Sequence, residues 1–463
     1  MSDLPKNWEY GKLSQAAHVV RGITFPAGEK RNDLAHGYVC CLRTTNVQQR
    51  LEWDDVYYVP TSYVKRDEQL VREGDVLMSM ANSYELVGKV ARAINVPQPA
   101  AFGAFLAAVR PTHAIDGGYL YHFLRSSNVQ SKLREGSSQT TNIANISVGK
   151  LSELTVPLAP WNEQKRIADK LDTVLSRVDA VNTRLARVAP ILKRFRQSVL
   201  AAATSGRLTV DWRNDSHPDV GDIPLNWKRT TLRHCITSMT GGASPSVEHY
   251  APAGVLALNK GDIKLYGRLA EKQDQKRVPK EFAELHGTKL VQKGDLLVTL
   301  RDLSNKADFL GLIAQFMGTE VALPTQGMYA LSVADNTLPK FLMYFSNSPI
   351  YREVMKREKV GATQVHLRND QFLDIPLALP PVKEQAEIVR RVETLFAFAD
   401  RLEARLQAAQ TATERLTPAL LAKAFRGELV PQDPNDEPAS ELLRRLEQEA
   451  PSTSTRRGRK SAV

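Results

Sequence analysis

Side chains that can read the edges of base pairs occur in three polar segments, and each segment has a counterpart in the other half of the chain. Arg, Lys, Asn and Gln present fixed sets of hydrogen-bond donors and acceptors, and hydroxyl groups add adaptable ones. The candidates in the first half are Arg43, Thr44, Asn46, Ser79, Asn82, Ser83, Tyr84, Gln139, Thr140, Thr141 and Asn142. The candidates in the second half are Asn259, Lys260, Arg301, Asp302, Asn305, Lys306, Thr363, Gln364 and His366. The alternative for each segment is an ordinary polar loop whose side chains cap turns.

No catalytic motif accompanies these segments. The sequence holds no Asp/Asn-Pro-Pro-aromatic motif for adenine methylation, and its pair Pro380-Pro381 leads into a helix. It also lacks a Gly-x-x-x-x-Gly-Lys-Ser/Thr phosphate loop, paired His/Cys metal ligands and a Gly-x-Ser-x-Gly nucleophile elbow. We therefore expect a binding protein that is not an enzyme and holds no metal or cofactor of its own.

The charge balance favours a polyanionic partner. The 463 residues include 62 Lys and Arg against 51 Asp and Glu, which gives a net charge of +11. Cations that neutralise phosphates release counterions, so such an excess favours nucleic acid. The tail after Gln432 holds basic residues among Ser, Thr and Gly and is expected to be disordered, either in contact with phosphates or simply solvated.

Cysteine use and hydropathy predict the compartment. Cys40, Cys41 and Cys235 show no metal-binding spacing, so we expect reduced thiols in the cores of a cytosolic protein. No run of 18 or more apolar residues and no apolar leader occurs, so the sequence predicts a soluble, cytoplasmic protein without a membrane partner.

The positions of short motifs reveal an internal duplication. Leu4-Pro5-Lys6-Asn7-Trp8 returns as Ile223-Pro224-Leu225-Asn226-Trp227, and three later motifs also recur at separations of 219 to 221 residues. These are Gly74-Asp75 with Gly294-Asp295, Glu163-Gln164 with Glu384-Gln385, and Gly206-Arg207-Leu208 with Gly427-Glu428-Leu429. The period is too long for a solenoid, so it indicates two copies of a module made of a domain and a long helix.

Apolar residues at alternating spacings of four and three predict these two helices. The first set is Ile167, Leu171, Val174, Val178, Leu185 and Leu192, with Val181 and Val188 at the positions between; the second is Ile388, Val392, Leu395, Leu402, Leu406 and Leu416, with the smaller Ala399, Ala409 and Thr413 between. Such heptads favour two helices that pack on each other as a spacer of about 48 Å. The alternative is two independent amphipathic helices, each packed on its own domain. Pro190 and Pro418 predict a kink or a restart in each helix.

The remaining segments predict α+β domains with several short strands. Strands are expected at residues 76–80 and 296–300, helices at 119–133 and 339–355, and closing strands that end at a proline at 154–157 and 374–376. The predicted order is a first domain (1–158), a central helix (159–203), a linker (204–221), a second domain (222–379), a distal helix (380–424) and a C-terminal segment (425–463).

Several of these motifs resemble one known family. Pro160-Trp161-Asn162-Glu163-Gln164 and Pro381-Val382-Lys383-Glu384-Gln385 resemble the Pro-x-x-Glu-Gln junction of type I restriction–modification specificity subunits. The Pro-x-x-Trp starts and the ending Ala424-Phe425-Arg426-Gly427-Glu428-Leu429 are also similar to that family.

The resemblance implies a non-catalytic subunit whose two target-recognition domains each read half of a bipartite, asymmetric site in double-stranded DNA. The long helices would pair as an antiparallel coiled coil and act as a ruler. The implied partners are two methyltransferase subunits that modify adenine with S-adenosylmethionine, and a restriction and motor subunit. The alternatives are a scaffold that pairs two proteins without reading DNA and, more remotely, a fused methyltransferase and reader.

Overall fold

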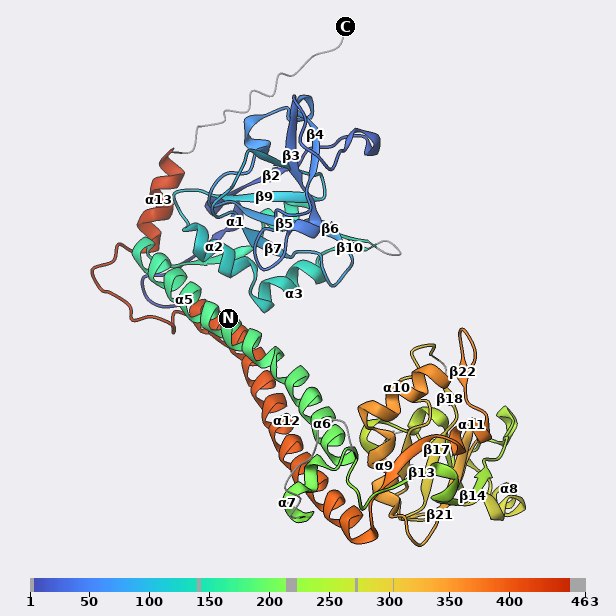
Figure 1. Ribbon diagram of the computed structural model, residues 1–463. Helices are drawn as coiled ribbons and strands as arrows, with labels where there is room; N and C mark the ends of the chain where they lie inside the picture. The colour runs from blue at the N-terminus through green and yellow to red at the C-terminus, as the bar shows by residue number, and fades with distance from the viewer. Residues whose placement is uncertain (1–3, 140–142, 214–222, 271–273, 303, 450–463) are drawn as a thin grey trace. The chain divides into compact units, whose positions relative to one another are not determined.

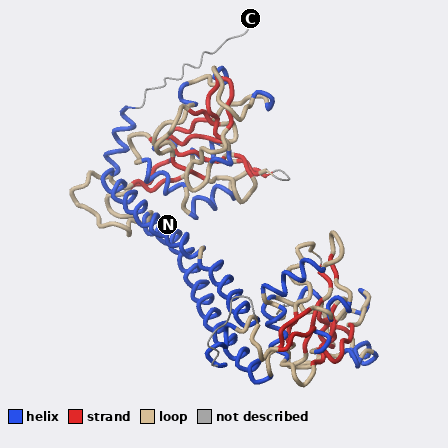
Figure 2. Tube along the Cα trace, viewed as in Figure 1, coloured by secondary structure: helices blue, strands red, loops and turns tan. Residues whose placement is uncertain are grey.

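The computed structural model describes residues 4–139, 143–213, 223–270, 274–302 and 304–449 (Figure 1). The chain divides into two compact units, residues 1–184 with 409–463 and residues 185–408. Each unit combines one mixed α and β domain with parts of the long helices (Figure 2). Helix and strand content of both kinds in two tandem domains agrees with the prediction. No helix within the described ranges is long and apolar enough to cross a membrane.

The first domain is built on two small sheets. The central sheet has the order β2-β9-β5-β7, and all its neighbouring strands are antiparallel. The second sheet has the order β4-β3-β8, in which β3 and β8 are parallel. The strands are β1 (Glu9–Lys12), β2 (Ala17–Arg21), β3 (Tyr38–Leu42), β4 (Tyr57–Pro60), β5 (Val76–Ser79), β6 (Ala81–Asn82), β7 (Val90–Arg92), β8 (Ala100–Phe102), β9 (Leu106–Pro111), β10 (Ser138–Gln139), β11 (Ala144–Asn145) and β12 (Thr155–Leu158).

The second domain repeats this topology. Its central sheet has the order β14-β21-β17-β19 and its second sheet the order β16-β15-β20, with β15 and β20 parallel. The strands are β13 (Lys228–Thr231), β14 (Ile236–Gly241), β15 (Val255–Leu258), β16 (Arg277–Val278), β17 (Leu296–Thr299), β18 (Arg301–Asp302), β19 (Ile313–Gln315), β20 (Ala322–Pro324), β21 (Met328–Val333), β22 (Val365–His366) and β23 (Pro376–Leu379).

Most of the predicted elements occur in these domains, with local differences. The buried strands β5 and β17 follow the Gly-Asp turns as expected, and the three cysteines are buried with free thiols. The closing strand β23 begins at Pro376 instead of ending there. Each helix predicted before the closing strands is in fact two, because the chain leaves the helix before a new one begins after Ser126 or Ser348.

Short helices pack against the central sheets. In Figure 1, α2 and α3 lie along one side of the strands β5 and β7, and the structure places α2 in contact with both strands. The short helices are α1 (Leu13–Ala16), α2 (Gly117–Leu124), α3 (Ser127–Glu135), α4 (Val148–Ser152), α7 (Val210–Arg213), α8 (Lys280–Leu285), α9 (Pro339–Ser346), α10 (Pro349–Glu358), α11 (Asn369–Leu373) and α13 (Ala439–Glu449).

The two prolines affect the long helices differently. The central helix consists of α5 (Trp161–Ala186) and α6 (Val188–Thr204), with an interruption at Arg187. Pro190 therefore lies in the first turn of α6, where its missing N–H costs no hydrogen bond. The distal helix α12 (Val382–Ala424) continues through Pro418, so the predicted restart there is wrong.

The predicted apolar faces are buried or half-buried, with one exception. Ile167, Leu171, Val178, Leu192, Ile388, Val392 and Leu406 are buried, and Val174, Leu185, Leu395 and Leu402 are half-buried. Leu416 is 44% exposed, which contradicts its predicted role in helix pairing. After Thr413 the buried face of α12 continues instead through Leu421 and Ala424. The heptad register of the distal helix is therefore lost near its end.

Candidate nucleic-acid interface

Two of the three predicted segments in each half lie side by side. In the first domain, β6 pairs with β11, which pairs with β10. In the second domain, β18 pairs with β22, so that Arg301 lies opposite His366. Segments that are far apart in the sequence thus form one polar edge beyond the end of the central strand β5 or β17.

The third segment reaches this edge through a β-turn. In the first domain, Gly103 N donates to Leu42 O (2.9 Å), and Met80 N donates to Phe105 O (2.8 Å). In the second domain, Thr325 N donates to Leu258 O (2.8 Å), and Leu300 N donates to Gly327 O (3.1 Å). We call each edge, with its 3₁₀ turn (Thr44–Asn46 or Lys260–Asp262) and its β-turn (103–106 or 325–328), a reading edge.

The reading edges also contain residues that were not among the predicted contact residues. Phe105 and Gln326 are exposed at the two β-turns, and Asn145 lies opposite Ala81. Gly103 and Gly327 signal turns after short strands. No sequence signal separates an exposed Phe from a buried one.

The predicted residues differ in their access to a ligand. Those with exposed side chains are Ser83, Tyr84, Gln139, Arg301, Asn305, Lys306, Thr363, Gln364 and His366. Those that are half-buried are Arg43, Thr44, Asn82, Asn259 and Lys260. Thr140, Thr141 and Asn142 lie outside the described residues, as do positions 214–222 of the linker region and the basic tail from 450 onward.

Three residues that were predicted to contact DNA are buried in the structure. Asn46 is 2% exposed; its Oδ1 accepts from Arg43 N (2.9 Å), and its Nδ2 donates to Glu52 O (3.0 Å) and Asp55 O (2.8 Å). Asp302 is 7% exposed and accepts from the backbone N–H groups of Ser304 and Phe309. Ser79 is fully buried and accepts from Asn82 Nδ2 (3.2 Å). These side chains hold the loops from within and are not exposed to a ligand in this structure.

Arg43 also has partners within its own domain. Its guanidinium pairs with the Asp55 carboxylate and lies 4.1 Å from the centroid of the Tyr57 ring. A DNA contact by Arg43 would have to compete with this arrangement.

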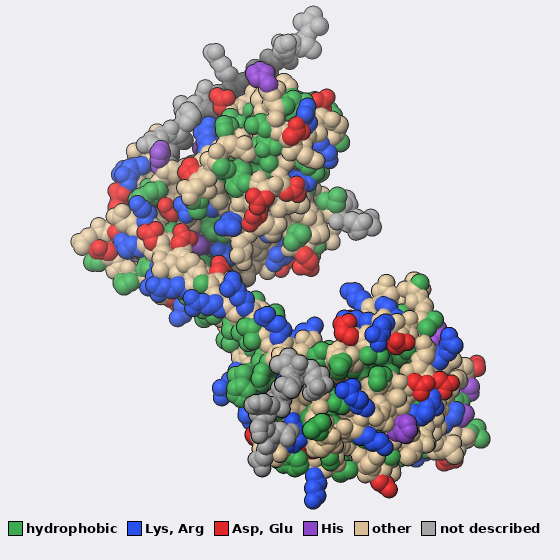
Figure 3. Space-filling view, in the orientation of Figure 1, with side chains coloured by type: hydrophobic (Ala, Val, Ile, Leu, Met, Phe, Trp, Pro, Cys, Tyr) green, Lys and Arg blue, Asp and Glu red, His purple; other side chains and the backbone are tan. Residues whose placement is uncertain are grey.

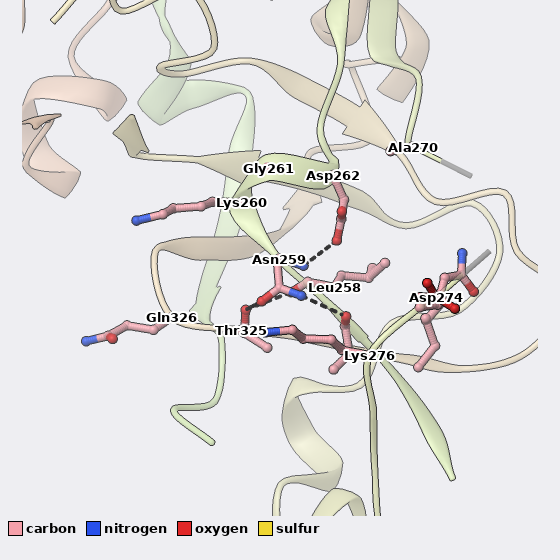
Figure 4. Close-up of a pocket in the computed structure, with 13 residues that line it drawn as sticks. Leu258, Asn259, Lys260, Gly261, Asp262, Ala270, Asp274, Lys276, Thr325 and Gln326 are labelled. Atoms are coloured by element: carbon pink, nitrogen blue, oxygen red, sulfur yellow. Dashed lines mark hydrogen bonds between the residues drawn. The ribbon is translucent and has the colours of Figure 1, made fainter. Parts of the chain in front are cut away.

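A cavity of about 350 Å³ lies beside the reading edge of the second domain. Thr325 Oγ1 donates to Leu258 O (2.8 Å) and to Asn259 Oδ1 (3.1 Å), while Asp262 accepts from Asn259 N (2.7 Å). In Figure 4, the side chains of Lys260 and Gln326 extend away from this network on the same side. The network holds the backbone firmly and leaves these two side chains outermost.

Positive charge is also displayed on the helices. Lys165, Lys170, Arg177 and Arg184 have exposed side chains on α5. A run of Lys and Arg is visible along this helix in Figure 3. Within the described ranges, no cluster of His, Cys, Asp or Glu could hold a metal ion.

The Glu-Gln junction motif anchors each long helix to its domain. Gln164 Oε1 accepts from Asp116 N (2.8 Å), and its Nε2 donates to Ala114 O (3.1 Å) and Ala159 O (2.9 Å). Gln385 makes the matching bonds to Leu338 N (2.8 Å), Asn336 O (2.8 Å) and Pro380 O (2.9 Å). The motif is thus structural and orients the reading domains.

Two similar domains with polar reading edges, held on long helices, define a tandem DNA-recognition protein. The model of the type I restriction modification DNA specificity domain matches residues 5–189 and 250–409. The chain therefore belongs to the type I restriction–modification DNA specificity family, and its role is DNA recognition without catalysis.

Individual relatives cover nearly the whole chain. The specificity subunit of the type I restriction enzyme EcoKI from Escherichia coli (strain K12) is 33% identical over 433 residues, 93% of this chain and 90% of that protein. The StySPI specificity subunit of Salmonella potsdam is 33% identical over 438 residues, with the same shares of 93% and 90%.

Two solved structures share the fold. One comes from a study of complex assembly and conformational transition of the type I R-M system; its TM-score is 0.69 at 18% identity, over 93% of this chain and 100% of that one. The HsdS subunit from Thermoanaerobacter tengcongensis has a TM-score of 0.56 at 19% identity, over 92% and 98%.

Proposed function

We propose that each domain reads one half of a bipartite, asymmetric DNA site within a type I restriction–modification complex. The observation that carries this proposal is the pair of reading edges. Both share an antiparallel strand pair (β6 with β11, β18 with β22) and a β-turn, yet they differ in side chains at equivalent positions. A duplicated framework with different surface chemistry is suited to two different half-sites.

The long helices would set the distance between the half-sites as an antiparallel coiled coil. Within the first unit, Leu421 and Ala424 share a core with Ile167 and Leu171. Within the second, Val199 and Leu200 share a core with Ile388 and Val392. The end of one helix thus lies beside the beginning of the other in each unit, which supports the antiparallel direction.

A second contact supports helix pairing in the second unit. Arg196 of α6 is 5% exposed and donates to Asp400 (2.6 Å) and Glu403 (2.8 Å) of α12. We infer the reading domains at 1–158 and 222–379, the helices at 159–203 and 380–424, the linker at 204–221 and the C-terminal segment at 425–463.

The catalytic steps would belong to partner chains. The relatives are named as specificity subunits of type I restriction enzymes, which supports partnership with two methyltransferase subunits and with restriction and motor subunits. S-adenosylmethionine would bind to the methyltransferase subunits, and this chain would need no cofactor.

Methylation mapping tests the proposal directly. The chain is co-expressed with its methyltransferase subunits, and methylated adenines are mapped by single-molecule sequencing. We expect a two-part motif with a fixed gap that disappears when this chain is deleted. Methylation that does not depend on this chain would contradict the proposal. A chain that pairs proteins but shows no salt-dependent DNA binding would be the scaffold instead.

Two alterations separate the roles of domains and helices. Replacing residues 1–158 with the domain of a relative should change only one half of the motif. Shortening α5 and α12 by one heptad each should change the gap and leave both halves as they were. A change in both halves after the first alteration, or an unchanged gap after the second, would refute the assignment.

A further inference from the structure

The β-turns of the two reading edges present opposite side-chain sizes at one position. Leu106 N donates to Gly103 O (2.8 Å), and Met328 N donates to Thr325 O (3.0 Å). Phe105 and Gly327 therefore occupy the same, third position of their turns. Phe105 is 64% exposed, whereas Gly327 offers no side chain at all.

The second edge fills this place from the neighbouring strand. Gly327 has a φ of +91°, a conformation that favours glycine. A Cβ atom at Gly327 would lie 3.4 Å from Arg301 Cδ and 3.5 Å from Arg301 Cβ. The aliphatic stem of Arg301 thus lies against the bare turn, in the space that a side chain at position 327 would enter.

The equivalent of Arg301 in the first domain is Ala81. The pairs Ser79 with Leu106 and Thr299 with Met328 fix this correspondence, since Ala81 and Arg301 each follow two residues later. The first edge therefore combines a small strand residue with a large turn residue, and the second edge combines a large one with glycine. One place on the surface displays an aromatic ring in one domain and a guanidinium in the other.

Among the described residues, the guanidinium of Arg301 makes no hydrogen bond and no ion pair; the backbone carbonyl of Arg301 accepts from Thr299 Oγ1 (2.9 Å). Its cross-strand neighbour is the exposed His366, and the adjacent Asp302 carboxylate is held by backbone N–H groups. By contrast, Arg277 in the same domain is paired with Glu320. Arg301 is thus free to donate to a ligand.

Other exposed apolar side chains follow β6 in the same domain. Tyr84 is 41% exposed and Leu86 is 46% exposed, and Phe105 O accepts from Met80 N directly before β6. Phe105 itself presents an exposed apolar ring that can contact an apolar group of a ligand.

We propose that Arg301 reads a guanine in the second half-site and that Phe105 reads a thymine methyl group at the corresponding position of the first. Arginine pairs bidentately with guanine O6 and N7, and apolar side chains contact the C5-methyl of thymine; both features lie in the major groove. The inference rests on the proposed function and adds to it the base chosen by each edge.

The test uses the complete complex with its methyltransferase subunits. The substrates are duplexes that carry each of the four base pairs in turn at every position of both half-sites, and the relative methylation rate and competition binding are measured. Arg301→Ala should reduce the preference for guanine at one position of the second half-site by about tenfold or more. It should leave the first half-site unchanged. Phe105→Ala should reduce a preference for thymine at one position of the first half-site only.

Matched variants control for general damage. Lys293→Ala and Ile94→Ala remove an exposed cation and an exposed apolar side chain near the opposite ends of β17 and β5, and both should keep the wild-type preferences. If Arg301→Ala abolishes methylation, competition binding of the Arg301→Lys complex shows whether the residue at position 301 sets the preference for guanine. Lysine should retain part of the guanine preference.

Transferring the residues of one reading edge to the other tests whether they are sufficient to change the preferred base. The double substitution Ala81→Arg with Phe105→Gly copies the second edge onto the first and should shift the corresponding position of the first half-site from thymine toward guanine. Unaltered preferences in Arg301→Ala and Phe105→Ala, or relaxation at a base other than guanine or thymine, would overturn the inference. Absence of any bipartite motif with the wild-type complex would instead overturn the proposed function.

Discussion

The junctions between domain and long helix contain the same Trp, Glu and Gln in both halves but connect them differently. Trp8 Nε1 donates to Glu163 (3.0 Å), whereas Trp227 Nε1 has no partner among the described residues. Glu384 instead accepts from Thr209 (2.8 Å), Asn226 (3.2 Å) and Arg213. The glutamines Gln164 and Gln385 make identical sets of bonds.

This difference indicates which contacts the duplication has preserved. The glutamines bond to backbone groups, which keep their positions as long as the fold is kept. The glutamates bond to side chains, which change with each substitution. Contacts to the backbone should therefore have equal energetic weight in the two halves, and contacts to side chains unequal weight.

The largest effect should come from the shared apolar packing at the helix ends. Leu200 and Leu421 occupy equivalent positions and are 0% and 2% exposed. Leu200→Ala and Leu421→Ala should each lower the free energy of unfolding by about 3 kcal/mol, because each leaves a cavity in a core. Urea denaturation measures this. The exposed Leu416 is the control, and Leu416→Ala should change stability by less than about 0.5 kcal/mol. Equal losses of stability at positions 416 and 421 would mean that the predicted heptad register continues to the end of α12.

Substitutions of the two glutamates should lower the free energy of unfolding by different amounts. Glu384→Ala removes a buried acceptor from three donors and should cost about 2–3 kcal/mol. Glu163→Ala removes one hydrogen bond and should cost about 1 kcal/mol. Burial raises the pKa of the Glu163 carboxyl, and its Oε1 has no partner within the described residues, so this carboxylate is poorly accommodated. Losses of the same size in denaturation of both variants would mean that the two junctions are equivalent after all.

Substitutions of the two glutamines should lower the free energy of unfolding equally in the two halves. Gln164→Ala and Gln385→Ala each remove three matching bonds and should destabilise their junctions by similar amounts, about 1.5 kcal/mol. Hydrogen exchange at the first turns of α5 and α12 reports each junction separately. Markedly unequal protection in the two variants would contradict the idea that bonds to the backbone are preserved.

The smallest expected effect is a dependence of stability on pH. Burial lowers the pKa of His122, although its bond to Asp172 (2.7 Å) opposes this. Below about pH 6.5 the unfolded chain takes up this proton more readily than the folded chain, so stability should fall between pH 7.5 and 5.5. The equivalent residue, Tyr344, does not titrate there, since burial raises its pKa to about 12. His122→Phe should flatten the dependence of urea midpoints on pH, and Tyr344→Phe should leave it unchanged. A slope that survives His122→Phe would place the acid sensitivity elsewhere.

Much of the architecture was predictable because it depends on local pattern. Repeated motifs locate the two modules, Gly-Asp turns locate β5 and β17, and heptads locate the long helices. The exposure of Leu416 and the continuity of α12 through Pro418 were not predictable, because both depend on what packs against the helix. Among the polar candidates, residue type could not distinguish the buried Asn46 and Asp302 from the exposed Arg301.

The duplication, the mixed α and β modules and the family can be read from the sequence, because they depend on residue order and spacing along the chain. The set of side chains that forms each reading edge depends on the folded structure. Arg301, His366 and the bare turn at Gly327 come together through strand pairing and hydrogen bonds between segments that are distant in sequence. The residue types are written in the sequence, but strand pairing brings the turn and the strand residue to one place, and no single segment shows this.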